Sequence, residues 1–448
     1  MPVIKKAKPM QPARTLCLGF LIIIIAGALL LWLPFSSKSG STSFFDCLFT
    51  ATSATCVTGL IVADTYSNWT IFGQAVIAML IQVGGLGFVT IITFFNVAAG
   101  KKLGFRTLAN VADGLTESTF QGGRRIFISI IKYSLIFEGA GAVLLCLRFV
   151  PQYGGYGVWM GVFTSITAFC NAGFDLCGIS SPFVSLTGYK SDPLVLVTVA
   201  LLITVGGLGF IVWENFLNIR SVRKLSLHTK AVLITSAVLT VGGTLFYLLA
   251  EWNGAFGEMN FGEKLLNAFF SSVTARTAGY NSVPIEDLSD FSQLGTCVLM
   301  FIGASPASTG GGIKTTTLLV LIMTVVSYMQ SKNDVEIMKH KIDKLAVYRT
   351  LTVTLLSLTA VILCFSVLYF TLPEDVRGVQ CLFEAVSAFS TAGLSAGITA
   401  ISGAAGRILL IITMFIGRVG PVSLVLSMMM NSTKRKNIVY PDGQIIVG

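Results

Sequence analysis

Long runs of apolar residues alternate with short polar connections along this chain of 448 residues. A helix rises about 1.5 Å per residue, so about 20 apolar residues cross the roughly 30 Å of hydrocarbon in a bilayer. We therefore expect an all-α polytopic membrane protein whose first span is retained, not cleaved as a signal peptide. The pattern predicts eight spans, over residues 15–34, 69–98, 126–149, 194–217, 230–250, 291–329 (interrupted), 346–371 and 405–430.

A 12-residue pattern occurs four times without a gap, each time in a short connection between apolar runs. The copies are FTATSATCVTGL (Phe49–Leu60), FTSITAFCNAGF (Phe163–Phe174), FFSSVTARTAGY (Phe269–Tyr280) and FEAVSAFSTAGL (Phe383–Leu394). Their glycines keep one register and recur every 106 to 114 residues, at Gly59, Gly173, Gly279 and Gly393. Repeated Thr/Ser/Ala-rich segments that end in glycine are suited to lining one axis with backbone carbonyls, as in an ion selectivity filter. The alternative is that the glycines merely end four short helices.

Each copy fits the same order of span, re-entrant segment and span. We expect four tandem helix–pore loop–helix repeats around one pseudo-fourfold pore, over residues 15–100, 124–218, 230–330 and 346–431, flanked by termini 1–14 and 432–448. About ten helical residues would lead inward in each copy, and the partial negative charge at their C-terminal ends favours a cation. An acid near the start of three copies suits a helix N-terminus: Asp46, Glu263 and Glu384.

The tail of each copy is the candidate filter strand. Irregular backbone at membrane depth survives only where it is buried in protein or faces water, and glycine permits the φ values that such a turn demands. The strands run over Thr55–Gly59, Phe169–Gly173, Ala275–Gly279 and Phe389–Gly393. The candidate filter residues are Thr55, Cys56, Val57, Thr58, Gly59, Cys170, Asn171, Ala172, Gly173, Thr277, Ala278, Gly279, Ser390, Thr391, Ala392 and Gly393.

Composition and charge agree with a membrane location. The chain is 54% hydrophobic and 12% charged, too little polar surface to cover a soluble body of this length. Lys and Arg gather before the first span, in every second connection and near the tail. The positive-inside rule then puts both termini in the cytoplasm and the four glycine loops outside. The net charge of +10 is mainly this orientation signal, so nucleic acid is not expected as a partner.

A second set of glycines lies in the spans that follow the candidate filters. VGGLGF occurs at Val83–Phe88 and Val205–Phe210, and the later repeats read IGASPA (Ile302–Ala307) and IGRVGP (Ile416–Pro421) in the corresponding places. Small residues allow close backbone approach, and plain helix packing explains the first two copies equally well. The segment 303–317, with one proline and four glycines, cannot continue as a helix and must form an intramembrane loop.

We expect a gate under the filter at this loop. Its candidate residues are Gly303, Ala304, Ser305, Ser308, Thr309, Gly310, Gly311, Gly312, Lys314 and Arg418. A charge inside a span costs about 2.5 to 3.5 kcal/mol on insertion scales, so Arg418 should face the pore or a partner. It either closes the path or braces two helices. Lys314 either marks the inner mouth or snorkels to the interface. Arg276 should point behind the filter, toward an acid.

The nine cysteines show neither a metal-binding spacing nor a catalytic one. Cys170 and Cys177 either form one external disulfide or remain two buried, inert thiols. No cluster of paired acids or histidines at membrane depth supports an enzyme. We therefore expect no catalytic residues, no resident cofactor and no bound metal apart from an ion in transit through the filter.

These motifs resemble the superfamily of Trk, Ktr and HKT potassium transporters over nearly the whole chain. Its length and short tail are most similar to the membrane subunit of bacterial Ktr systems. In that family, glycine at all four filter positions goes with potassium preference, and serine in the first loop goes with sodium transport in some plant relatives. The resemblance implies potassium uptake across the bacterial cytoplasmic membrane, with an arginine at the place of Arg418 linked to the gate.

The resemblance also implies a homodimer seated on a cytoplasmic ring of nucleotide-binding regulatory subunits, with the nucleotide on that partner. Sodium coupling stays open, as does a sodium-conducting or sodium-coupled transporter of the same fold. A secondary transporter with two inverted repeats fits four direct repeats less well.

Overall fold

The structure is a computed structural model that describes residues 12–87, 123–179, 181–218 and 225–428. The regular elements of this part of the chain are helices and one antiparallel hairpin, β1 (Glu336–Ile337) and β2 (His340–Lys341), in which Ile337 pairs with His340. Most of the predicted N-terminal segment 1–14, the predicted tail 432–448 and residues 88–100 of the predicted first repeat lie outside the described residues.

Four long helices open the four predicted repeats. They are α1 (Pro12–Leu31), α7 (Gly123–Tyr153), α11 (Leu227–Ala250) and α15 (Lys344–Thr371). Among the described residues, these four carry stretches long and apolar enough to cross a membrane, and a fifth span results if one bent pair of helices is counted together. The spans predicted to open the repeats at 15–34, 126–149, 230–250 and 346–371 therefore have helical counterparts.

The second span is broken in the second, third and fourth predicted repeats, and in the first the described helix ends at Leu86. The helices concerned are α4 (Ile71–Leu86), α9 (Pro193–Leu208) with α10 (Phe210–Asn218), α13 (Asp290–Phe301) with α14 (Thr315–Met329), and α18 (Ala404–Val419) with α19 (Pro421–Met428). Gly87, Gly209 and Gly420 end helices with φ of 84°, 94° and 89°, a conformation that favours glycine. At Gly209 the chain bends by 94°. The prediction of continuous spans over 194–217 and 405–430 was wrong, whereas the interruption within 291–329 is confirmed.

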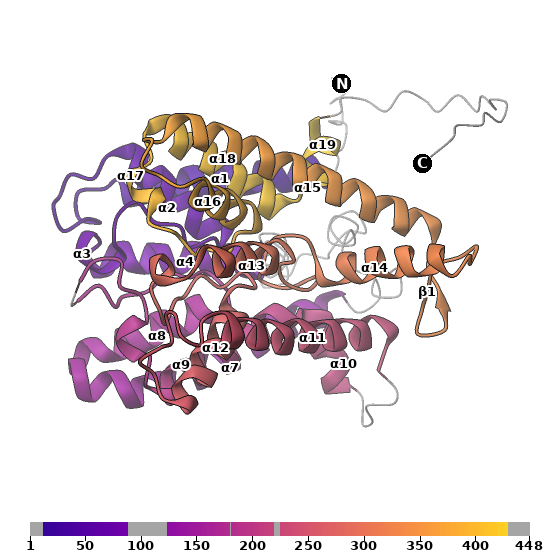
Figure 1. Cartoon of the computed structure of the whole chain (residues 1–448). Helices are drawn as coiled ribbons and strands as arrows, with labels where there is room; N and C mark the ends of the chain where they lie inside the picture. Colours follow the sequence, from indigo (N-terminus) through magenta and orange to yellow (C-terminus); the bar gives the residue numbers. More distant parts are fainter. Residues whose placement is uncertain (1–11, 88–122, 180, 219–224, 429–448) are drawn as a thin grey trace, which may run out of the picture.

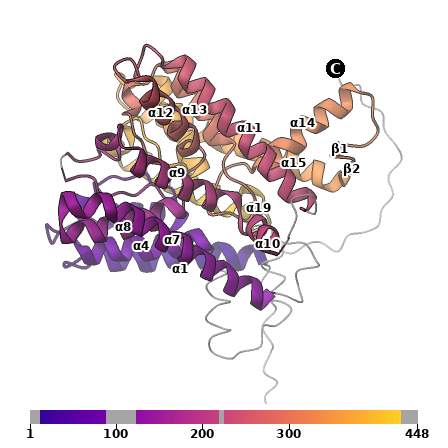
Figure 2. The same ribbon diagram turned by 90° about the horizontal axis from the view of Figure 1, so that it is seen from below.

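Four short helices carry the first part of each 12-residue copy. They are α2 (Phe44–Cys56), α8 (Gly155–Phe169), α12 (Phe261–Thr274) and α16 (Gly378–Ser390). Figure 1 shows them toward the end of the molecule at which α3 (Thr65–Asn68) and α17 (Ile398–Ile401) lie, and Figure 2 gives the same bundle from below. The hairpin lies at the opposite end. Two 3₁₀ turns, Thr187–Tyr189 and Ile285–Asp287, lie in the connections that follow α8 and α12.

Phenylalanines anchor the short helices in the core. Three of the copies begin with a fully buried phenylalanine, namely Phe49, Phe163 and Phe383. In the third copy the fully buried phenylalanine is the second residue, Phe270. Many large apolar side chains are exposed instead on the long helices, among them Ile22, Leu147, Val238 and Phe370.

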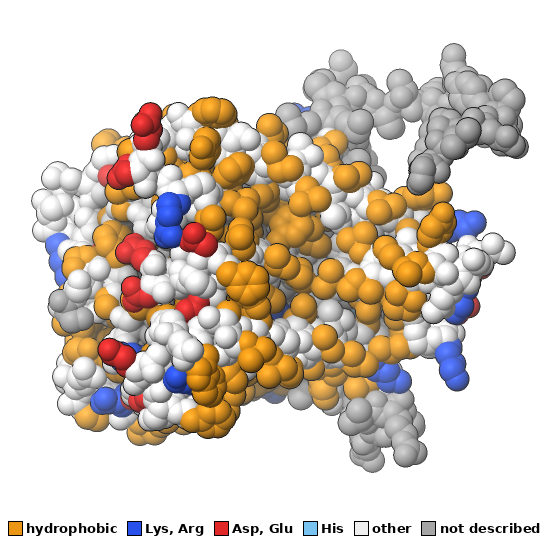
Figure 3. Space-filling model, in the orientation of Figure 1, with side chains coloured by type: hydrophobic (Ala, Val, Ile, Leu, Met, Phe, Trp, Pro, Cys, Tyr) orange, Lys and Arg blue, Asp and Glu red, His pale blue; other side chains and the backbone are white. Residues whose placement is uncertain are grey.

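The surface divides into zones along the length of the molecule. On the face shown in Figure 3, hydrophobic side chains cover the middle, acidic ones gather together with several Lys and Arg at the end with the short helices, and further Lys and Arg lie at the end with the hairpin. Such a belt suits contact with lipid tails.

Candidate ion filter and gate

The short helices end inside the 12-residue copies, and three of them end with the same hydrogen bond. In copies one, two and four, the N–H of the tenth residue donates to the carbonyl of the fifth. The pairs are Thr58 to Ser53 at 2.8 Å, Ala172 to Thr167 at 2.8 Å and Ala392 to Ser387 at 2.9 Å. This bond is the 6→1 contact of a Schellman cap, and it turns the chain sharply out of the helix. In the third copy, Ala278 donates to Thr274 at 3.0 Å instead.

The ninth residue of every copy adopts the left-handed conformation although none is glycine. The φ values are 58° for Val57, 59° for Asn171, 70° for Thr277 and 52° for Thr391. Such a conformation costs roughly 1 to 3 kcal/mol for a residue with a side chain, so it persists only where the surrounding structure fixes it. Sequence reasoning missed this feature, because only Asn171 is of a type that readily adopts it.

The four glycines of the pattern form a closed ring of contacts. Each has a positive φ: 95° for Gly59, 68° for Gly173, 85° for Gly279 and 82° for Gly393. A Cβ built on each would lie 2.8 Å or less from the carbonyl oxygen that precedes the next glycine. The pairs are Gly59 with Ala172, Gly173 with Ala278, Gly279 with Ala392, and Gly393 with Thr58. The four segments therefore follow one another around one centre in chain order, and no side chain fits at these positions.

An open cavity of about 590 Å³ adjoins this ring. All four glycines line it, together with two carboxylate side chains, Asp175 and Glu286. Asp175 is partly buried, and its Oδ1 accepts a hydrogen bond from the N–H of Cys177 at 2.9 Å. The cavity therefore brings two carboxylate side chains and the glycine ring to the wall of one open space.

The second set of glycines packs against the ends of the short helices. A Cβ on Gly84, Gly206 or Gly417 would overlap a carbonyl oxygen, that of Thr55, Phe169 or Phe389 respectively. These three carbonyls belong to the seventh residue of their copies, so the contact repeats in register. Gly303 differs, because its nearest neighbour is the carbonyl of Gly311 within the same loop. The four glycines were predicted to be equivalent. Three of them contact the carbonyl of the seventh residue of a copy, and Gly303 does not.

Some predicted filter residues are still helical. Thr55 and Cys56 lie in the last turn of α2, and Ser390 is the last residue of α16. The carbonyls of Thr55, Phe169 and Phe389 face the glycines of the following helices. The irregular part of the candidate filter strand therefore starts later than predicted in copies one, two and four, since Phe169 is also the last residue of α8.

The interrupted span forms a loop beneath these segments, over residues 302–314. A Cβ on Gly310 would overlap the hydroxyl of Thr277, and one on Gly311 would overlap that of Thr391. The loop therefore lies directly against the ninth residues of copies three and four. It is held by its own hydroxyls, since Ser308 Oγ donates to Ser305 O at 2.6 Å and Thr315 Oγ1 donates to Ser305 Oγ at 3.1 Å.

Arg418 joins this loop to the first repeat. Its guanidinium donates to the carbonyls of Thr309 in the loop and of Gly84 in α4, and reaches the carbonyl of Gly85 at 3.4 Å. Lys314 stays within the loop, because its Nζ donates to the carbonyl of Gly310 at 2.7 Å. Two cationic side chains thus lie beside the loop, without a carboxylate partner among the ion pairs of the described residues.

Arg276 points behind the third filter segment, as predicted, but not toward an acid. Its guanidinium donates to Ser236 O at 3.3 Å, to Ser236 Oγ at 3.1 Å and to Thr240 Oγ1 at 3.3 Å. Hydroxyls and a carbonyl of α11 therefore take the place of the expected carboxylate.

Two further expectations are settled for the described residues. Cys170 and Cys177 are both buried free thiols. Asp46 and Glu263 lie in the first turns of α2 and α12, and Glu263 completes a capping box with Asn260. Glu384 does not lie at a helix start. It is the seventh of the 13 residues of α16, because that helix already begins at Gly378.

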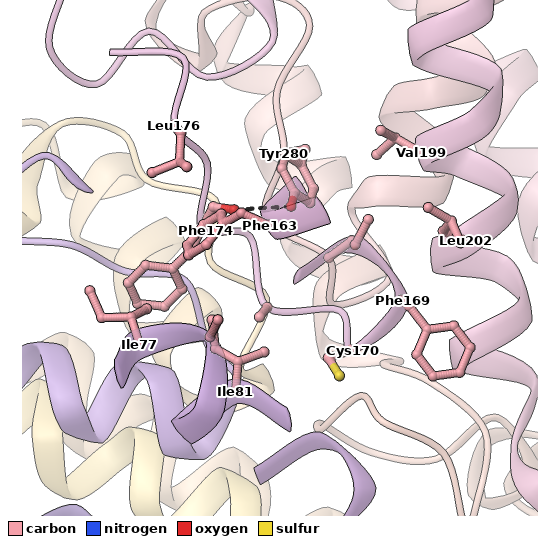
Figure 4. Packing of buried hydrophobic residues seen from close by; sticks show 14 of the residues in the cluster. Ile77, Ile81, Phe163, Phe169, Cys170, Phe174, Leu176, Val199, Leu202 and Tyr280 are labelled. Carbon is pink, nitrogen blue, oxygen red and sulfur yellow. Dashed lines mark hydrogen bonds between the residues drawn. The ribbon is translucent and has the colours of Figure 1, made fainter. Parts of the chain in front are cut away.

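Sequence reasoning also missed Tyr280, which follows Gly279. Its hydroxyl donates to the carbonyl of Phe174 at 3.0 Å (Figure 4). It also contacts the hydroxyl of Thr167. The third copy thereby braces the last residue of the second. A tyrosine after the glycine was the only signal in the sequence, and nothing in the pattern shows which neighbour it reaches.

Comparison with known proteins agrees with this architecture. Residues 18–438 match the family model TrkH, described as cation transport protein. The chain belongs to this family of cation transport proteins. It is thus a transporter, not an enzyme, and a multi-pass membrane protein. The TrkH match includes all four copies and the loop.

Individual relatives cover nearly the whole chain. It is 38% identical to the potassium/sodium uptake protein NtpJ of Enterococcus hirae, over 100% of both chains. It is also 38% identical to the Ktr system potassium uptake protein B of Bacillus subtilis, over 98% of this chain and 97% of that protein. The crystal structure of the potassium transporter TrkH from Vibrio parahaemolyticus superposes with a TM-score of 0.73, over 96% of this chain and 87% of the other. At 16% identity that likeness shows the fold.

Proposed function

We propose that this chain takes up potassium ions across the bacterial cytoplasmic membrane, through a filter formed by the four 12-residue copies. In this proposal the chain consists of four tandem helix–pore loop–helix repeats around one pseudo-fourfold pore. The closed ring of Gly59, Gly173, Gly279 and Gly393 carries the proposal. Carbonyl oxygens that surround one axis can replace the hydration shell of an ion, and the helix ends behind them add partial negative charge.

Potassium is the ion we propose, bound by the carbonyls that the glycine ring brings together. A side chain at any of the four positions would displace a neighbouring carbonyl, so the glycines keep the carbonyl ring at its present width. Relatives named as potassium uptake proteins support the same choice. A second candidate, transport of sodium or coupling to it, is favoured by one observation: NtpJ is named a potassium/sodium uptake protein.

We further propose that the loop 302–314 and Arg418 close the path beneath the filter. The loop lies against Thr277 and Thr391, and the guanidinium of Arg418 links it to the carbonyl of Gly84. A fixed positive charge at this place repels a cation that leaves the filter. Opening then requires that the loop moves and that Arg418 exchanges its carbonyl partners for water.

The remaining expectations belong to the same proposal. Both termini are cytoplasmic and the cavity beside the glycine ring faces outside, since Lys and Arg gather in the connections on the same side as the termini. The protein works as a homodimer on a cytoplasmic ring of nucleotide-binding regulatory subunits, and the chain itself holds no cofactor. Two relatives of the chain are named as parts of Ktr systems, which supports a partner subunit.

The test measures potassium and sodium uptake by cells that lack their own potassium uptake systems. The variants are Gly59→Ser for the filter and Arg418→Ala for the gate. Gly242→Ala is the matched control, because a Cβ at Gly242 in α11 meets nothing within 4 Å. We expect potassium-selective uptake by the unmodified chain, loss of ion preference in Gly59→Ser and faster, less regulated uptake in Arg418→Ala.

Two results would refute the proposal. Equal uptake of both ions by the unmodified chain would favour the sodium alternative. Unchanged preference and rate in both variants, at equal amounts in the membrane, would mean that the four copies serve only helix packing.

A further inference from the structure

A buried carboxylate ties the fourth candidate filter to its own short helix. Glu384 is fully buried in the middle of α16. Its carboxylate accepts hydrogen bonds from Ser395 Oγ at 2.9 and 3.2 Å, from the N–H of Ala396 at 3.3 Å and from Thr399 Oγ1. All three donors follow Gly393 in the chain. The contacts therefore lie at the outer end of this filter segment.

Hydroxyl groups brace the same end of the other copies, and beyond the second copy Asp175 also accepts a hydrogen bond from Cys177 N–H at 2.9 Å. Ser53 Oγ accepts a hydrogen bond from the N–H of Gly59 at 3.1 Å. Thr274 Oγ1 donates to the carbonyl of Tyr280 at 2.6 Å, and the hydroxyl of Tyr280 donates to the carbonyl of Phe174 at 3.0 Å. Among these braces, that of the fourth copy alone is a carboxylate carried by the short helix before the filter segment. It is also the one with the most donors.

The position of Glu384 in its copy sharpens this contrast. The second residue of the first copy is Thr50, which is also buried, and its hydroxyl has no hydrogen-bond partner among the described residues. A carboxylate in the interior is costly unless several donors satisfy it. The donors to the Glu384 carboxylate all belong to residues 395–399, so they satisfy it only while this segment keeps its present conformation. The carboxylate and this segment therefore fix each other.

We propose that Glu384 is a positioning residue that holds the outer end of the fourth filter segment and thereby contributes to ion selectivity. This inference rests on the proposed filter. The inner end of the segment is already fixed by the hydrogen bond from Ala392 N–H to Ser387 O. With both ends fixed, Gly393 keeps its positive φ and its contact with the carbonyl of Thr58. Release of the outer end lets the ring widen to suit other ions.

The experiment compares Glu384→Gln with the double variant Ser395→Ala/Thr399→Val in proteoliposomes that contain the full-length protein. The first variant keeps the shape of the side chain but brings an amide against the N–H donor of Ala396. The second removes two donors and leaves the carboxylate in place. The readout is the ratio of potassium to sodium uptake at equal protein amounts. We expect the ratio to fall about tenfold in both, the factor that corresponds to about 1.4 kcal/mol.

Two matched variants separate this inference from the filter itself. Thr50→Val removes a hydroxyl without a partner at the equivalent position and should leave the ratio unchanged. Gly393→Ser should abolish the preference if the filter is correctly assigned. A wild-type protein without preference would overturn both proposals. If Gly393→Ser loses the preference while the double variant keeps the wild-type ratio, the role of Glu384 alone is overturned. If Glu384→Gln fails to fold, the ratio measured for the double variant decides the question.

Discussion

The guanidinium of Arg407 lies 2.7 Å from the carboxylate of Asp46, which joins α18 to α2 across 361 residues of chain. The side chains are only 23% and 28% exposed, and Arg407 also donates to the carbonyls of Ser402 and Ala400. Shielding from water strengthens the pair, and the extra hydrogen bonds orient the guanidinium. The bridge thus closes the bundle between its first and last parts.

We expect Arg407→Gln to lower the thermal stability of the purified protein, by the equivalent of about 1 to 2 kcal/mol. A double-mutant cycle with Asp46→Asn measures the coupling. The ion pair between Arg377 and Asp290 is the control, because its side chains are 49% and 53% exposed and such pairs contribute little. Equal losses at the two sites would contradict a special role for the bridge.

The glycine ring makes a prediction about stability as well as selectivity. Gly173→Ala places a Cβ 2.8 Å from the carbonyl of Ala278 at a φ of 68°. We expect a loss of about 1 to 3 kcal/mol from backbone strain, together with reduced ion preference. Gly188→Ala should change neither, because its Cβ meets nothing within 4 Å and its φ is not in the left-handed region. Thermal unfolding and competitive rubidium uptake measure the two effects.

The glycines under the filter predict a different result. A Cβ on Gly417 would overlap the carbonyl of Phe389, so Gly417→Ala must push α18 away from the end of α16. Since Arg418 is the next residue, its contacts with Thr309 and Gly84 should loosen too. We expect a changed basal uptake rate at unchanged ion preference. A variant that lost preference but kept its rate would show that Gly417 acts on the filter and not on the gate.

The register of the filter glycines could be predicted from the sequence because a turn with positive φ requires a residue without a side chain. The short helices before them followed from the same repeat. The breaks at Gly209 and Gly420 could not be predicted, because glycine in an apolar span is also typical of close helix packing. Both functions coexist here, since Gly206 packs against Phe169 while Gly209 ends the helix.

Partners of buried charges were the least predictable part. The type of residue showed that Arg276 and Glu384 need polar neighbours, but not which ones. Ser236 and Thr240 lie 36 to 40 residues before Arg276, and no spacing pattern connects them. For Glu384 the error arose from the helix start, since Gly378 gives no strong N-terminal signal and α16 begins earlier than the copy does.

The cavity beside the glycine ring, which we propose faces outside, predicts a dependence on external pH. Burial raises the pKa of Asp175 to about 7, with a further contribution from the negative charge of Asp64, while the hydrogen bond from Cys177 N–H acts in the opposite direction. Asp175 lines the cavity next to Gly173 and gains its charge as the pH rises through 7. A negative side chain there attracts a cation. The apparent affinity for potassium should therefore improve between pH 6 and 8, by about two- to threefold for one partly screened charge.

Asp175→Asn removes this dependence, and Glu286→Gln, on the exposed side of the same cavity, is the matched control. The stability of the folded protein should fall as Asp175 becomes ionised. Because the pKa in the folded protein lies above the ordinary 3.8, ionisation of Asp175 costs stability as the pH rises from about 4 to 7. Asp175→Asn should therefore gain thermal stability relative to the unmodified chain over that range. A pH profile of potassium affinity that Asp175→Asn leaves unchanged would assign the dependence to another group and remove Asp175 from the path of the ion.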